Sequence, residues 1–275
     1  MNKITKINNV RLINDEFVEK KEQDLNVLYN YLKSRDFNYF PNLIERKENY
    51  NRYKYIEDYS IDDNQKSQDL IYKLALLHNK TSFNKEVNLY KNKEIYEKLK
   101  GYIKHLKDKH NKMIEEFEYF EFPSPSQQVY MYNYSKLIAC LGFIDINIDS
   151  WYKLVENKTK ERVVMIHGNP NLDHIIKNDR TYLISWNNSR IETPIIDIVT
   201  LYHQVWDKVE FSSLLERYLS KCELSESELK LLLINMTLPL EINNATTEFE
   251  RVIEMNKFVN YIYKTEELVR PYYSK

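Results

Sequence analysis

The spacing of the apolar residues changes twice along this chain of 275 residues, and those changes limit the folds open to it. Residues 1–59 hold short apolar runs around one helical segment. Residues 60–158 place apolar side chains three or four positions apart, as helices do, and residues 163–184 return to short runs. This order predicts an α+β fold with a small β-rich N-terminal lobe, 1–59, and a large, mainly helical C-terminal lobe, 60–275.

Within the N-terminal lobe the pattern predicts strand, strand, helix, strand, strand. Short strands are expected over residues 7–22, on either side of a turn at Asn14-Asp15. A helix is expected from Asp24, with that residue as its cap. After Pro41, residues 43–45 and 53–56 again have the composition of strands.

Within the C-terminal lobe, helices are expected from Ser60 to His78, over residues 84–118, from the Pro123 and Pro125 loop to about Leu141, and over 149–158. Small strands are expected at 163–166, 175–176 and 182–184, and mostly helix from Ile195 onward.

The bulk properties exclude several classes of function. The net charge is −1, so no bulk field favours nucleic acid, and no apolar run reaches the length of a membrane span. The two cysteines lack metal-ligand spacing, and the first residues contain no apolar signal segment, so a cytoplasmic protein is expected. Three glycines in the whole chain disfavour a glycine-rich phosphate loop.

The most specific motif lies in a catalytic-loop-like segment, residues 163–200. It reads His167-Gly168-Asn169-Pro170-Asn171-Leu172-Asp173-His174, followed by Ile184-Ser185-Trp186 and by Pro194-Ile195-Ile196-Asp197. This segment resembles the catalytic region of the aminoglycoside phosphotransferase and choline kinase family, with the pattern H-G-D-x-x-x-x-N, then I-D-W, then P-x-x-D. Leu74-Ala75-Leu76-Leu77-His78 resembles a second family helix, and the long helical stretch at 84–145 is similar to the spore-coat kinase-like branch.

The resemblance implies a protein-kinase-like fold, with ATP and magnesium as cofactors. In such kinases an Asp in the loop accepts the proton of the substrate hydroxyl, while an Asn and a second Asp hold magnesium. Here Asn169 replaces the base, and His174 and Ser185 replace the two metal ligands. Neutral Asn is no base, and His and Ser suit magnesium poorly, so ordinary phosphoryl transfer is expected to be lost.

Other residues of the motif are expected to support the loop or to bind the nucleotide. His167 is expected to brace the loop and Asp197 to bind its backbone. Lys20 or Lys21 is the candidate for the lysine that contacts phosphates, although the same segment is also interpreted as a solvated strand end. Asp173 is a possible substitute carboxylate for a metal, and His174 itself offers a donor for a softer ion such as zinc or manganese. No metal ligand is assigned.

Outside the motif, packing roles are favoured. His105 and His110 are five residues apart, which is wrong for a helical metal pair, so both are expected at the surface. His78 is expected to be a hydrogen-bonded core residue, the tyrosines at 130–134 to pack rather than to line a ligand groove, and Cys140 to be inert.

Together these features predict a pseudokinase that acts by binding an unknown small ligand or a protein partner. An active ATP-dependent small-molecule phosphotransferase with an atypical metal site is the alternative, and an accidental match is a third possibility. Whether the chain is an enzyme is left open. ATP and magnesium follow from the resemblance alone.

Overall fold

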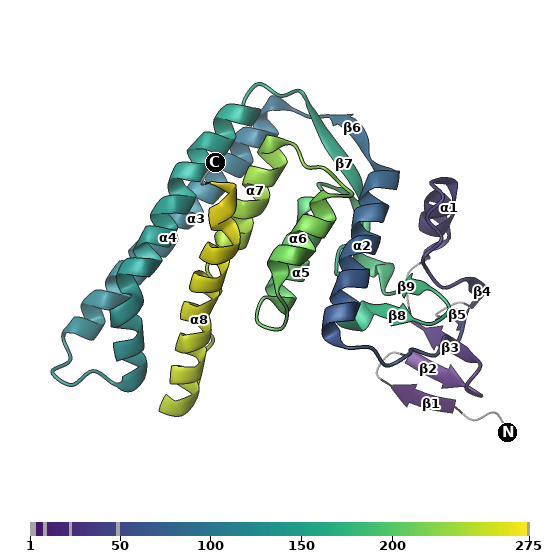
Figure 1. Ribbon diagram of the computed structural model, residues 1–275, viewed down its shortest axis with the longest axis horizontal. Helices are drawn as coiled ribbons and strands as arrows, with labels where there is room; N and C mark the ends of the chain where they lie inside the picture. Colours follow the sequence, from purple (N-terminus) through teal and green to yellow (C-terminus); the bar gives the residue numbers. More distant parts are fainter. Residues whose placement is uncertain (1–3, 8–9, 22–23, 48–49, 274–275) are drawn as a thin grey trace. The chain divides into compact units, whose positions relative to one another are not determined.

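The computed structural model describes residues 4–7, 10–21, 24–47 and 50–273 (Figure 1). The chain divides into two compact units, each built from two separate stretches of sequence. We call them the sheet unit, residues 1–84 and 162–223, and the helix unit, residues 85–161 and 224–275. A lobe boundary at residue 59 stays a prediction.

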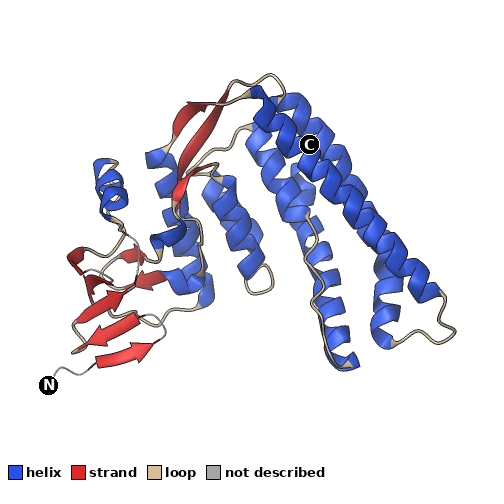
Figure 2. Ribbon diagram, turned by 180° about the vertical axis from the view of Figure 1, so that it is seen from behind, coloured by secondary structure: helices blue, strands red, loops and turns tan. Residues whose placement is uncertain are grey.

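The sheet unit begins with a five-stranded antiparallel sheet, red at the N-terminal end of the chain in Figure 2. The strand order is β1-β2-β3-β5-β4. The strands are β1 (Ile4–Ile7), β2 (Val10–Ile13), β3 (Phe17–Lys20), β4 (Leu43–Lys47) and β5 (Tyr50–Lys54). At the predicted turn, Asn14 and Asp15 have positive φ angles of 52° and 56°, a conformation that these two residue types tolerate in tight hairpins.

One helix, α1 (Asn26–Ser34), joins β3 to β4. The expected cap at Asp24 is wrong by one position, because Leu25 is the N-cap residue, although the Asp24 carboxylate does accept a hydrogen bond from the backbone N–H of Asn26 (3.0 Å). The last predicted strand is also displaced, since β5 ends at Lys54.

The remainder of the sheet unit carries the loop motif. Helix α2 (Asp63–Thr81) is capped by Asp62, whose side chain accepts a hydrogen bond from the Gln65 N–H (2.8 Å). The later elements are β7 (Lys160–Ile166), the 3₁₀ turn η1 (Leu172–His174), β8 (Ile175–Lys177), β9 (Thr181–Leu183), η2 (Trp186–Asn188), β10 (Arg190–Glu192), α5 (Ile195–Val205) and α6 (Phe211–Leu219). The three predicted strands are confirmed as β7, β8 and β9.

The described part of the helix unit is a bundle of four helices, seen side by side in Figure 1. They are α3 (Leu89–Glu118), α4 (Pro125–Val155), α7 (Glu226–Thr237) and α8 (Glu248–Val269), and a short turn, η3 (Arg270–Tyr272), follows α8. Capping boxes at Ser225 and Thr247 start α7 and α8. Its core is a single apolar cluster that includes Ile103, Leu137, Leu141, Ile144, Trp151, Ile234, Phe258 and Ile262.

Two helix predictions in this region are wrong. Residues 125–155 form one continuous helix, α4, rather than two helices, because Ile144 and Ile148 are buried in the core and hold residues 142–148 in helical register. The helix expected from residue 84 begins at Leu89 instead, and the strand β6 (Phe83–Glu86) precedes it. No helix within the described residues is long and apolar enough to cross a membrane.

Candidate functional site

Asp197 lies at the centre of the loop motif. It is fully buried in the first turn of α5. Its Oδ1 accepts a hydrogen bond from the N–H of Gly168 (2.8 Å), and its Oδ2 accepts one from the N–H of His167 (2.7 Å). One buried carboxylate therefore fixes two consecutive peptide groups of the loop, as a carboxylate with several acceptor sites can.

His78 holds the same carboxylate from the end of α2. Its Nε2 lies 3.0 Å from Asp197 Oδ2, and its Nδ1 lies 2.8 Å from the hydroxyl oxygen of Tyr218. Burial alone would raise the pKa of Asp197, but the hydrogen bond from His78, the nearby His167 and the Gly168 N–H lower it overall. The expected role of His78 as a hydrogen-bonded core residue is confirmed. Its partner Tyr218 had no signal in the sequence.

Gly168 occupies a position where only glycine fits. Its φ is +82°, and a Cβ built on it would lie 2.1 Å from the carbonyl oxygen of Asn188. That oxygen belongs to the backbone and cannot move aside as a side chain can. The His-Gly pair of the motif is therefore explained by the close approach of the 167–168 loop to η2.

His167 is buried beneath the loop. Its Nε2 lies 2.8 Å from the carbonyl oxygen of Ile184, just before Ser185, and its ring centroid lies 4.8 Å from that of Trp186. Burial lowers the pKa of His167, which favours the neutral imidazole near pH 7. The loop and the segment that follows β9 are thus joined through this side chain.

Two of the three positions that differ from the kinase pattern are in direct contact, and the third follows Ile184, whose N–H donates a hydrogen bond to the His174 carbonyl oxygen (3.0 Å). Asn169 and His174 are directly linked, because His174 Nδ1 lies 2.8 Å from the Asn169 carbonyl oxygen. Ser185 has a left-handed backbone, with φ 67° and ψ 51°, and its Oγ accepts a hydrogen bond from Lys20 Nζ (3.0 Å). Lys20, at the end of β3, therefore reaches the motif.

Two other candidate residues are not brought into this contact. Lys21 is exposed, and Asp173 is exposed in η1, where its backbone N–H binds the Asn171 side chain (3.0 Å). The interpretation of residues 19–22 as a solvated strand end is wrong for Glu19, which is 6% exposed and pairs with Arg52 (2.6 Å). Glu22 lies outside the described residues.

The side chains at these positions offer no carboxylate to a magnesium ion. Magnesium prefers carboxylate and phosphate oxygens, whereas the three positions offer an amide, an imidazole and a hydroxyl. The buried carboxylate of Asp197 is hydrogen-bonded to His78 and the loop backbone. Across the part of the chain that the structure describes, no group of three or more His, Cys, Asp or Glu side chains is placed to hold a metal ion.

The segment after the N-terminal sheet is tied to the hairpin that follows the loop, a feature with no signal in the sequence. Asp58 Oδ1 accepts a hydrogen bond from the N–H of Lys177 (2.8 Å), and the Tyr59 N–H donates to the carbonyl oxygen of Lys177 (2.7 Å). These bonds hold the segment that follows β5 against β8.

Outside the motif, the predictions for single residues had mixed outcomes. Tyr130 is buried in the helix-unit core, as expected, but Tyr132 is 81% exposed. The expectation of a surface position is wrong for His110, which is 3% exposed, because its Nδ1 contacts the Tyr130 hydroxyl (2.9 Å) inside the bundle. Burial raises the pKa of Cys140 to about 12, which disfavours its reactive thiolate form.

The sequence matches no protein-family model and no curated protein. Solved structures do resemble the chain. An aminoglycoside phosphotransferase from Alicyclobacillus acidocaldarius superposes with a TM-score of 0.68 at 9% identity, covering 98% of this chain and 90% of that one. A glucosamine kinase gives 0.56 at 9% identity, over 98% and 77% of the two chains, and a spectinomycin phosphotransferase gives 0.51 at 8% identity, over 99% and 90%.

The chain therefore has a kinase-like α+β fold, in which an antiparallel N-terminal sheet is followed by a mainly helical region. More particularly, it is the fold of the aminoglycoside phosphotransferases. The expected resemblance is confirmed at the level of the fold. Identities of 8–9% carry the fold alone.

Proposed function

We propose that this protein is a degenerate member of the aminoglycoside phosphotransferase and choline kinase family, a pseudokinase that binds a ligand or partner without ordinary phosphoryl transfer. One observation carries the proposal. The buried Asp197 holds the loop backbone, while Asn169, His174 and Ser185 supply neither a carboxylate base nor a carboxylate ligand for magnesium.

Nucleotide is the first ligand to test. A glucosamine kinase with the same fold was solved with glucosamine, ADP and inorganic phosphate. In this chain the Lys20 ammonium reaches Ser185 and so stands next to the position of the family's second magnesium ligand. A lysine so placed supplies a charge for phosphate without any metal.

The decisive experiment restores the missing ligands. ADP binding is measured by calorimetry, with and without magnesium, for the wild type and for the double variant His174→Asn, Ser185→Asp. Asp tolerates the left-handed backbone at position 185, so the change suits the local geometry. We expect wild-type affinity to be independent of magnesium, and the variant to gain roughly tenfold when magnesium is added.

Two controls separate this effect from a general change in charge. Ser213→Asp adds a carboxylate on the exposed surface of α6 and is expected to leave ADP binding unchanged. Lys20→Met is expected to weaken ADP binding by roughly tenfold, the loss of one charge-assisted hydrogen bond.

Phosphate transfer by the wild type is the result that would contradict the proposal. Magnesium-dependent phosphate transfer from ATP to a small hydroxyl compound by the wild type, abolished by Ser185→Ala, would overturn the proposal and support the active phosphotransferase instead. Absence of ADP binding under every condition would remove nucleotide from the proposal and leave a protein partner or another small ligand.

A further inference from the structure

The connection between α3 and α4, residues 119–124, carries exposed aromatic rings at one end of the helix unit (Figure 1, lower left). We call it the α3–α4 loop. The side chains of Tyr119, Phe120 and Phe122 are 91%, 54% and 85% exposed. Single exposed apolar side chains are common, but several large rings in one short loop form the kind of patch that marks an interaction site.

Hydrogen bonds hold both ends of this loop. At its start, the Phe120 N–H donates to the Phe117 carbonyl oxygen (3.2 Å), and the Phe117 ring packs edge-on against the buried Tyr130, with centroids 5.5 Å apart. At its end, the Ser124 N–H donates to Gln127 Oε1 (2.8 Å) in the capping box of α4. The rings are therefore presented from a fixed backbone, which lowers the entropic cost of binding through them.

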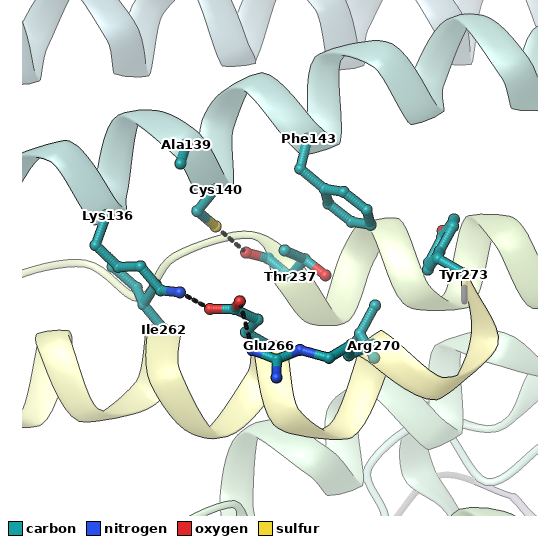
Figure 3. Close-up of a pocket in the computed structure, with 10 residues that line it drawn as sticks. Lys136, Ala139, Cys140, Phe143, Thr237, Ile262, Glu266, Arg270 and Tyr273 are labelled. Carbon is teal, nitrogen blue, oxygen red and sulfur yellow. Dashed lines mark hydrogen bonds and ion pairs between the residues drawn. The ribbon is translucent and has the colours of Figure 1, made fainter.

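The same part of the chain is strongly acidic. Residues 113–135 contain no lysine, arginine or histidine, and their acidic residues are Glu115, Glu116, Glu118 and Glu121. All four carboxylates are exposed, and none forms an ion pair within the part of the chain that the structure describes. The next basic side chain, Lys136, instead forms an ion pair with Glu266 of α8 (Figure 3). The loop is thus surrounded by negative charge that the folded chain does not neutralise.

Aromatic rings and carboxylates that lie next to one another favour the same kind of partner. The face of a ring attracts a guanidinium or ammonium group, and a carboxylate pairs with it. The four glutamates would repel the phosphates of a nucleic acid or of an anionic membrane. In a symmetric dimer formed through this surface, the glutamates of one copy would face those of the other.

From these features we propose that the α3–α4 loop docks a basic segment of a partner protein, one in which arginine or lysine side chains alternate with apolar ones. The cations contact the rings of Tyr119 and Phe122. They also pair with the adjacent carboxylates of Glu118 and Glu121, while the apolar side chains cover the remaining ring area. This surface is independent of the pseudokinase proposal, because it shares no residue with the loop motif.

Three labelled peptides test the proposal on the full chain. Binding is measured by fluorescence anisotropy for a fluorescein-labelled peptide of alternating arginine and leucine, for one of arginine and serine, and for one of glutamate and leucine. We expect saturable binding of the arginine–leucine peptide that weakens with added salt. The arginine–serine peptide should bind more weakly, and the glutamate–leucine peptide should not bind.

Two double variants separate the rings from the charges. Tyr119→Ser with Phe122→Ser is expected to weaken binding of the arginine–leucine peptide by about tenfold or more, because aromatic side chains dominate such interfaces. Glu118→Gln with Glu121→Gln should weaken it by about two- to fivefold and reduce its salt dependence. All four positions are exposed, so both variants should fold, which circular dichroism checks.

The opposite end of α3 supplies matched controls. Tyr90→Ser and Glu97→Gln change an exposed ring and an exposed carboxylate near the start of this 30-residue helix and should leave binding unchanged. Absence of saturable binding, unchanged binding in both loop variants, or an equal loss in the controls would overturn the proposal.

Two further measurements distinguish other occupants. Binding of the chain to phosphatidylserine vesicles, lost in the variant without the two rings, would overturn the proposal and assign the surface to a membrane. A dimer in sedimentation experiments, lost in the same variant, would overturn it in favour of a second copy of this chain.

Discussion

At the scale of single residues, the loop depends most on the one glycine that has a positive φ. Gly168→Ala would place a methyl group against the Asn188 carbonyl oxygen and strain the backbone at φ +82°. We expect it to lower the free energy of unfolding by about 2 kcal/mol or more, measured by urea denaturation.

The chain supplies a matched control for that change. Gly101 lies in α3 with nothing within 4 Å of its missing Cβ. Gly101→Ala should therefore raise stability by about 0.5–1 kcal/mol, because alanine favours helix. Equal effects of the two substitutions would show that the close approach at Gly168 does not govern the loop.

The motif shows which features of the site can be predicted from the sequence and which need the structure. The identity of Asn169, His174 and Ser185 was visible in the sequence, because it needs only an alignment of short patterns. The hydrogen bond from Lys20 to Ser185 joins residues 165 positions apart, and the spacing of apolar side chains carries no information about it. The same holds for the contact of His78 with Tyr218, 140 positions apart.

At the scale of helices, a buried histidine in α3 makes the stability of the folded protein depend on pH. Burial, with a smaller effect from Lys109, lowers the pKa of His110 from 6.5 to about 4. The unfolded chain then binds the proton more readily than the folded one, so stability is complete above pH 6.5 and falls as the pH drops toward 4. The loss amounts to at most about 3 kcal/mol.

This loss is measured by chemical denaturation at a series of pH values. His110→Gln, which keeps a polar partner for Tyr130, should flatten the profile between pH 6.5 and 4. His105→Gln, at an exposed position of the same helix, should not. Parallel profiles for the wild type and His110→Gln would contradict the assignment.

Elements were predictable where local pattern and burial agree. The strands β7 to β9 and the helices after Ile195 combine a clear apolar period with buried side chains. The strand β6 gave no such signal, since all four of its residues are exposed. The continuity of α4 depends on its contacts with α8, which lie far along the chain.

At the scale of the whole molecule, neither compact unit is a single stretch of sequence. In the helix unit, α3 and α4 share their core with α7 and α8, where Ile234 and Phe258 pack with Leu141 and Ile144. A chain ending at Glu223 lacks both later helices. We expect it to lose hydrogen-exchange protection in α4 and to expose apolar surface, because one face of the α3–α4 hairpin is left uncovered.

Because the truncation removes two helices at once, a point variant in the same core provides a milder test. Phe258→Ala removes one buried ring and should cost about 3–4 kcal/mol, while Phe249→Ala, on an exposed position of α8, should change stability by less than about 0.5 kcal/mol. Full protection of α4 in the truncated chain would show that the α3–α4 hairpin is stable alone.

The hydrogen bonds of Asp197 to the loop backbone also bear on how such a protein changes over generations. Because Asp197 holds the loop from its buried side, we expect exchange of side chains such as those of Asn169 and Ser185 to leave the fold intact. In the genetic code, Asn to Asp and His to Asn are single-base changes, whereas Ser to Asp needs at least two. Position 185 therefore requires more base changes than either other position to reach a sequence with the kinase base and both metal ligands.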